Sequence, residues 1–163
     1  MTRIADAAPG TPATVALNRA GIAFTPHSYA HDPAATSFGG EAAVLLGVDP
    51  ERVFKTLLAA ADSTLVVGIV PVSGQLDLKA LAAAVGAKRA RMAQAAEAER
   101  KTGYVVGGIS SIGQKYALQT VLDDTAELFE TIFVSGGRRG FDIELAPSDL
   151  LAVTGGILAS IGR

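Results

Sequence analysis

The chain has 163 residues, 49% of them hydrophobic and 18% charged, which suits one folded domain with its own core and excludes a disordered protein. Cysteine is absent, so disulfides, thiolate metal sites and a cysteine nucleophile of the protein's own are excluded. Fourteen basic and sixteen acidic residues give a net charge of −2. Since a domain that holds nucleic acid mainly through phosphates is usually basic, any contact with RNA must be local or assisted by a partner.

Two features of the sequence concern the location of the protein. No apolar segment follows the lone Arg3, as a secretory signal would require. The apolar runs at 57–61 and 65–72 are far too short to span a bilayer. We therefore expect a cytoplasmic protein with no membrane partner. Residues 1–10 are expected to form a flexible tail, and residues 11–163 a single domain.

Helix and strand signals alternate irregularly along the first half of the chain. Thr11 and Pro12 supply an N-cap and a proline for the first turn, and Gly21 follows as a stop signal. Two apolar runs meet at Asp62-Ser63 and predict a β-hairpin. The elements expected here are helices at 13–20 and 40–46, a strand from 22–24 toward Tyr29, and strands at 53–61 and 64–72.

The second half continues in the same way, with short strands between glycine-rich turns. We expect helices at 78–85, 94–100 and 147–153, and strands at 104–106, 120–122, 131–135 and 141–145. Strands and helices that are interspersed without strict alternation predict a mixed-sheet α/β or α+β fold.

His27 and His31 are the first candidates for a functional site, because they are four residues apart. They follow Pro26 in a segment that reads as extended, where four residues span roughly 13 Å. One zinc ion with bonds near 2 Å cannot reach both side chains from that geometry. This favours ordinary polar or capping histidines, and we expect neither a metal nor another cofactor.

Two glycine-rich segments and one lysine are the other candidates. Residues 107–113 lack the endings of the nucleotide-binding glycine motifs, and residues 135–140 are typical of a tight turn, although two arginines there suit a phosphate. No GxSxG motif is present, so a serine triad is not supported. Lys55 lies inside an apolar run, so it either extends to solvent or is held in a pocket by something negative or electron-rich.

Taken together and in order, several segments resemble the YbaK/EbsC family. The first half contributes 31–33 (HDP), Phe38-Gly39 with Glu41, 54–57 (FKTL) and 74–79 (GQLDLK). The second half contributes 102–110 (TGYVVGGIS), 113–115 (GQK), 135–140 (SGGRRG) and 142–145 (DIEL). The resemblance covers roughly residues 11–160.

This resemblance implies a freestanding relative of the editing domain of bacterial prolyl-tRNA synthetases, with a curved, barrel-like mixed β-sheet surrounded by helices. The family hydrolyses misacylated tRNA, and its YbaK branch favours Cys-tRNA(Pro). The implied partners are the 3′ end of tRNA(Pro) carrying cysteine and possibly the synthetase. The implied catalytic residue is Lys55, and the implied substrate-binding residues are Tyr29, Phe38, Thr56, Gly107, Gly108, Ser135 and Asp142. The chain departs from the family at Ser111, where a loop proline is usual, which leaves the rigidity and selectivity of that loop open.

The chemistry expected from the resemblance is cleavage of the ester by the substrate's own thiol, with release of a cyclic thiolactone. Lys55 and the backbone N–H groups around Gly107 and Gly108 are the expected donors to the developing negative charge. Two alternatives remain: hydrolysis of Ala-tRNA(Pro) by an activated water, and a non-catalytic module that binds a tRNA end or a synthetase.

Overall fold

The computed structural model describes residues 9–34 and 38–163, without the side chains of residues 38 and 39. The side chain of Phe38 and residues 1–8 of the expected tail therefore lie outside the described part of the chain.

Most of the helices begin and end where the sequence predicts. Thr11 accepts a hydrogen bond from the Thr14 amide at the start of the first helix, and Asp77 accepts one from the Ala80 amide at the start of another. Gly103 and Gly155 end two helices in the left-handed conformation that glycine adopts without strain. The helical elements are α2 (Pro12–Arg19), α3 (Phe38–Leu46), α4 (Leu78–Ala84), α5 (Ala95–Thr102), the 3₁₀ helix η1 (Asp124–Leu128) and α6 (Pro147–Thr154).

The strands form two sheets. The larger sheet has the order β4-β2-β3-β5-β8 and is mixed, because β2 pairs antiparallel with β3 and β4 whereas β5 runs parallel to β3 and β8. The smaller sheet has the antiparallel order β1-β7-β6. The strands are β1 (Thr25–Ser28), β2 (Phe54–Ala61), β3 (Thr64–Pro71), β4 (Ala90–Met92), β5 (Gln119–Asp123), β6 (Ile132–Arg138), β7 (Phe141–Leu145) and β8 (Ile157–Ala159).

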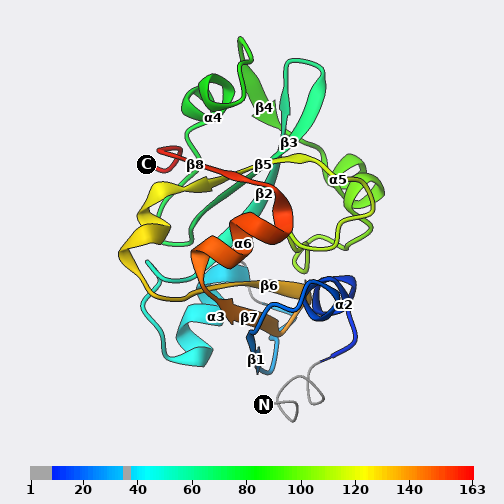
Figure 1. Cartoon of the computed structure of the whole chain (residues 1–163), viewed down its shortest axis with the longest axis vertical. Coiled ribbons are helices and arrows are strands. Elements are labelled where there is room, and N and C mark those ends of the chain that lie inside the picture. Colours follow the sequence, from blue (N-terminus) through cyan, green and yellow to red (C-terminus); the bar gives the residue numbers. More distant parts are fainter. Residues whose placement is uncertain (1–8, 35–37) are drawn as a thin grey trace.

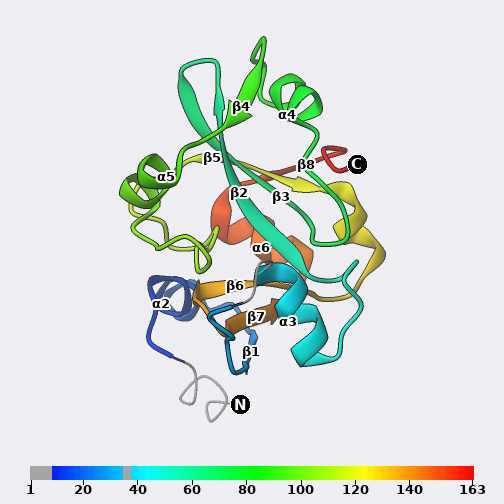
Figure 2. The same ribbon diagram turned by 180° about the vertical axis from the view of Figure 1, so that it is seen from behind.

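The two sheets meet at one place. Val53, just before β2, forms an isolated parallel bridge with Phe133 of β6, and the Phe133 amide donates to the Arg52 carbonyl at 2.9 Å. In Figures 1 and 2 the larger sheet lies above the smaller one, with α6 across the middle and α2 and α3 on either side of the smaller sheet. The expected mixed α/β fold is confirmed, but the described strands form two sheets joined at this bridge and not one sheet closed into a barrel.

The core follows from the strongly apolar β2–β3 hairpin. Side chains on both faces of β3 are buried: Val67 and Ile69 belong to the main core, and Val66 and Val70 to a second cluster under α4. Burial on both faces explains why this strand is a continuous apolar run and not an alternating one. The hairpin is thus the frame that fixes β2 and the residues it carries.

One expected strand is wrong. Residues 104–106 form part of a turn, because their backbone groups are paired locally and not with a neighbouring strand. The Gly108 amide donates to the Val105 carbonyl at 2.8 Å, and the Val106 amide donates to the Glu99 carboxylate at 2.9 Å. The sequence also did not predict β4, β8 and η1.

Among the described residues, the longest helix is α3 with nine residues. A bilayer span needs roughly 20 residues, so none of the described helices reaches that length.

Candidate active site

A pocket of about 380 Å³ lies in the wedge between the two sheets, just beyond the bridge that joins them. One wall is the first half of β2, and the opposite wall comes from β6 and β7. Helix α5 and the turn that follows it cover a third side. The pocket is lined by Tyr29, Ala42, Val53, Phe54, Lys55, Thr56, Leu57, Leu58, Met92, Ala93, Ala95, Ala98, Val106, Gly107, Ile109, Ser135, Arg138 and Asp142.

Six of the expected site residues therefore line one pocket, although they are more than a hundred positions apart in sequence. These are Tyr29, Lys55, Thr56, Gly107, Ser135 and Asp142. Gly108 does not line it, and the side chain of Phe38 lies outside the described part of the chain. The structure shows that these six residues share one pocket, and their individual roles stay predictions.

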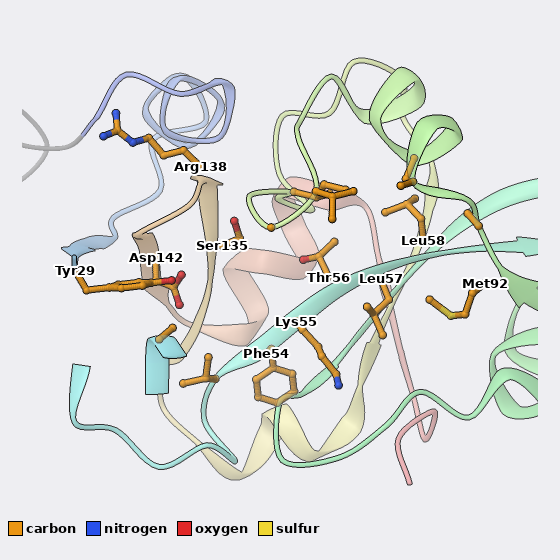
Figure 3. A pocket seen from close by; sticks show the side chains of 18 residues that line it. Tyr29, Phe54, Lys55, Thr56, Leu57, Leu58, Met92, Ser135, Arg138 and Asp142 are labelled. Atoms are coloured by element: carbon orange, nitrogen blue, oxygen red, sulfur yellow. The ribbon is translucent and has the colours of Figure 1, made fainter. Parts of the chain in front are cut away.

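One end of the pocket is acidic. Asp142 of β7 is only 6% exposed, and no described side chain or amide hydrogen-bonds to its carboxylate. Burial raises the pKa of Asp142 to about 7, because desolvation penalises the ionised form. Tyr29 points toward Asp142 (Figure 3), and burial together with the Asp142 charge raises the pKa of the Tyr29 phenol, which stays a proton donor.

Ser135 lies opposite Asp142 in the β6–β7 register, so the hairpin holds the two side chains at the same level. Its hydroxyl accepts a hydrogen bond from the Gly137 amide at 3.2 Å, at the irregularity between Ser135 and Arg138. A bulge re-aims the side chains next to it. The Phe141 ring packs so closely against Gly136 that a Cβ there would collide with it, which keeps this turn in place.

Lys55 and Thr56 are the polar groups of the β2 wall. Lys55 is partly buried, and within the described residues its ammonium has no ion pair or hydrogen bond. The Thr56 hydroxyl is buried without a hydrogen-bond partner. A buried hydroxyl left unpaired costs roughly 1–3 kcal/mol, so an unpaired group on a pocket wall marks a place for a ligand or a water.

The glycine-rich turn contributes one free donor and not two. The Gly108 amide is already bonded to the Val105 carbonyl, whereas the Gly107 amide has no hydrogen bond among the described residues. Gly108 serves packing, because a Cβ there would lie 2.7 Å from the Arg138 Cα. Of the two amides expected to be donors, only that of Gly107 is free to donate, and its role stays a prediction.

Arg138 lines the pocket, although the sequence did not single it out as a site residue. It is exposed at the rim, and its guanidinium has no partner among the described residues. Its neighbour Arg139 instead donates to the Val106 carbonyl at 2.7 and 3.1 Å, which ties the β6–β7 turn to the glycine-rich turn. The two arginines of the SGGRRG segment indicated a possible anion site. The structure shows that Arg138 lines the pocket and that Arg139 is used in a hydrogen bond between the two turns.

The other end of the pocket is apolar. Leu57 and Leu58 of β2 and Met92 lie toward the end away from Tyr29 and Asp142 (Figure 3), and Ala95 and Ala98 of α5 also line the pocket. The pocket thus has an anionic end, an apolar end and two cationic groups, Lys55 on the wall and Arg138 at the rim.

Ser111, the departure from the family pattern, does not line this pocket. It is buried beside a separate pocket of about 220 Å³, where its hydroxyl is also unpaired. The loop around it is held by two hydrogen bonds, because the Tyr104 hydroxyl donates to the Ile112 carbonyl at 2.6 Å and the Gln114 side-chain Nε2 donates to the Ser110 carbonyl at 2.9 Å. Ser111 therefore does not enlarge the main pocket directly.

The two histidines lie against different carboxylates. His27 Nε2 is 2.9 Å from Glu144 Oε1, and His31 Nδ1 is 2.8 Å from Glu41 Oε1. The structure groups no three potential metal-ligating side chains within the residues it describes.

This arrangement suits a small acyl group that carries an ammonium group and is attached to a polyanion. A carboxylate binds an ammonium group, an apolar wall binds a short side chain, and free cations bind phosphate. Lys55 and the Gly107 amide are additional donors for an oxygen that becomes negatively charged during ester cleavage.

Comparison with known proteins identifies the family to which such a pocket belongs. Residues 31–153 match the model of the aminoacyl-tRNA editing domain. A protein of Enterococcus faecalis (strain ATCC 700802 / V583), described as the Cys-tRNA(Pro)/Cys-tRNA(Cys) deacylase EbsC, is 43% identical over 117 residues, which are 71% of each chain.

Solved structures agree with this family. A structure described as a trans-editing enzyme for prolyl-tRNA synthetase superposes with a TM-score of 0.82 at 25% identity, over 93% of this chain and 95% of that one. The hypothetical protein APE2540 superposes with a TM-score of 0.80 at 24% identity, over 90% and 96% of the two chains, and supports the fold alone. The chain belongs to the aminoacyl-tRNA editing domain family and is an aminoacyl-tRNA deacylase.

Proposed function

We propose that this protein is a trans-editing deacylase that hydrolyses mischarged Cys-tRNA(Pro) in the cytoplasm. The observation that carries the proposal is the charge layout of the pocket, in which a buried unpaired carboxylate and an unpaired ammonium lie on different walls. An aminoacyl ester presents a cationic amino group on one side of its carbonyl and a nucleotide on the other. The named activity of the 43% identical relative supports the choice of cysteine and tRNA(Pro).

Asp142 binds the α-ammonium group of the substrate in this proposal. Its carboxylate is buried and has no partner among the described residues, so the ammonium replaces hydration that the folded chain has removed. An approaching cation lowers the pKa of a carboxyl group, so binding itself favours the ionised form of Asp142. Tyr29 closes this end of the pocket.

Lys55 and the Gly107 amide act on the carbonyl oxygen. When the cysteine thiol attacks the carbonyl carbon, a C–S bond forms and the carbonyl oxygen gains negative charge. The ester C–O bond then breaks, the thiolactone is released, and the proton lost by the thiol ends on the 3′-oxygen of the tRNA. Preorganised donors that stabilise such an oxygen contribute about 2.7–4 kcal/mol each.

The Thr56 hydroxyl favours a second candidate, hydrolysis of Ala-tRNA(Pro) by water. Its oxygen is buried, unpaired and on the pocket wall, where an ordered water has room. Alanine has no nucleophile of its own, so its ester needs such a water.

The test compares three esters of tRNA(Pro), those of cysteine, alanine and α-aminobutyrate, which has the size of cysteine without its thiol. The proposal expects rapid cleavage of the cysteinyl ester and little cleavage of the other two. Equal rates for the cysteinyl and aminobutyryl esters would refute attack by the thiol, and fast cleavage of the alanyl ester would favour the water mechanism.

Prolyl-tRNA synthetase is proposed as a partner. The net charge of −2 gives the chain little overall attraction for RNA, so binding of tRNA alone should be weak and salt-sensitive. A protein that holds the charged tRNA would compensate by raising its local concentration. Addition of the synthetase should lower KM for Cys-tRNA(Pro), and an unchanged KM would argue against this partner.

A further inference from the structure

Tyr116 lies on the surface between two lysines. Its residue surface is 50% exposed, and the ammonium groups of Lys101 and Lys115 lie 5.2 and 5.6 Å from the centre of its ring. The backbone fixes this arrangement, because the Lys115 amide donates to the Thr102 carbonyl at 2.9 Å and the Tyr116 amide to the Lys101 carbonyl at 3.3 Å. We call Lys101, Lys115 and Tyr116 the Tyr116 platform.

The platform collects positive charge without neutralising it. Glu97 precedes Lys101 by one helical turn on α5, yet no described carboxylate forms an ion pair with either lysine. The aromatic ring attracts each ammonium only modestly, and the two like charges repel each other. An anion placed beside the ring would interact favourably with both lysines at once.

The platform is also close to the pocket. Ala95 and Ala98 of α5 line the pocket, and Lys101 follows Ala98 by three residues, a rise of about 4.5 Å along the helix. A substrate that leaves the pocket along α5 therefore meets the platform within the length of one or two nucleotides.

The surface charge also differs between the two sides of the molecule, with the lysines of the platform on one side and acidic residues on the other. Between residues 116 and 137 the chain has no Lys or Arg, and the exposed residues Asp124 and Glu127 lie in η1. Helices α5 and η1 lie on opposite sides of the molecule in both views (Figures 1 and 2). An approaching polyanion is thus attracted to the α5 side and repelled from the η1 side.

We propose that the Tyr116 platform binds the RNA next to the reacting 3′ end, with a base stacked on the Tyr116 ring and phosphates beside Lys101 and Lys115. This inference rests on the proposed function, and it adds a binding surface outside the pocket. An exposed aromatic ring with flanking cations is the combination that binds single-stranded nucleic acid without regard to sequence.

The experiment measures binding of a fluorescently labelled RNA hairpin that has a single-stranded 3′ end and carries no amino acid. Binding is followed by fluorescence anisotropy over a range of salt concentrations. The variants are Tyr116→Ala, Tyr116→Phe and the pair Lys101→Ala with Lys115→Ala. The matched control is the pair Lys79→Ala with Lys88→Ala, which changes the net charge equally on exposed lysines elsewhere. Melting curves establish that each variant is folded.

We expect the platform pair to reduce the slope of log affinity against log salt by about 1.4 to 1.8, since each lost phosphate contact removes about 0.7–0.9. Tyr116→Ala should weaken binding about 5-fold or more, and Tyr116→Phe should bind like the unmodified protein. The proposal is overturned if the control pair weakens binding as much as the platform pair, or if Tyr116→Ala binds normally.

Because the RNA carries no ester, this result is separate from catalysis. If the unmodified protein binds the hairpin through the platform but cleaves no aminoacyl ester, the proposed function fails. If the unmodified protein cleaves Cys-tRNA(Pro), and the platform variants cleave it with the same KM and bind the hairpin with the same affinity, only the inference about the platform fails.

Discussion

Replacing Asp142 by asparagine removes a buried charge while keeping the size of the side chain. Burial raises the pKa of Asp142 from 3.8 to about 7, so the folded protein binds this proton more tightly than the unfolded chain does. For an acid whose pKa is raised on folding, the stabilising contribution is present at low pH and lost as the pH rises from about 4 through 7. The unmodified protein therefore becomes less stable over this window because of Asp142.

The magnitude follows from the shift. Each pKa unit corresponds to about 1.4 kcal/mol, so the destabilisation is about 4 kcal/mol at pH 8, about 3 kcal/mol at pH 6 and about 2 kcal/mol at pH 5. Asparagine has no charge to desolvate at any of these values. The free energy of unfolding of Asp142→Asn, relative to that of the unmodified protein, should therefore rise by about these amounts between pH 4 and pH 8.

Urea denaturation followed by circular dichroism at pH 4, 5, 6 and 8 measures this difference. The control is Asp124→Asn, which makes the same chemical change at an exposed carboxylate and should show much less variation with pH. A difference for Asp142→Asn that stays constant across the four pH values would refute the reasoning. Because the carboxylate is also proposed to bind the substrate ammonium, the stabilised variant should lose most of its activity at pH 8.

Three further substitutions test two residues of the pocket and the turn beside it. Lys55→Ala should stay folded and lose about 100-fold or more in the rate of Cys-tRNA(Pro) deacylation, whereas Lys79→Ala should not; a loss of only a few-fold would end the catalytic assignment. Thr56→Val removes the unpaired buried hydroxyl and should raise the free energy of unfolding by about 1 kcal/mol, and a destabilised variant would show that the hydroxyl is in fact paired. Gly108→Ala places a Cβ 2.7 Å from the Arg138 Cα and should cost about 1–3 kcal/mol, as thermal denaturation would show; an unchanged melting temperature would mean that the two turns are not in firm contact.

The sequence by itself determined the elements that depend on local chemistry. The cap at Thr11 and the stop at Gly103 fix helix ends, because each acts on backbone groups a few residues away. The β2–β3 hairpin follows equally well from two apolar runs around Asp62-Ser63. The segments shared with the family predicted the editing function and six residues that line the pocket.

Only the tertiary structure decided what depends on partners distant in sequence. The three-residue strands β4 and β8 exist because β2 and β5 supply their hydrogen-bond partners, which no local pattern reveals. The structure also shows that the Gly108 amide is already bonded and that Ser111 lies outside the main pocket. It shows that Arg138 lines the pocket, whereas Arg139 binds the Val106 carbonyl. The raised pKa of Asp142 has the same origin, because the residue type sets its value in water, and burial between β6, β1 and the pocket wall sets its value in the folded protein.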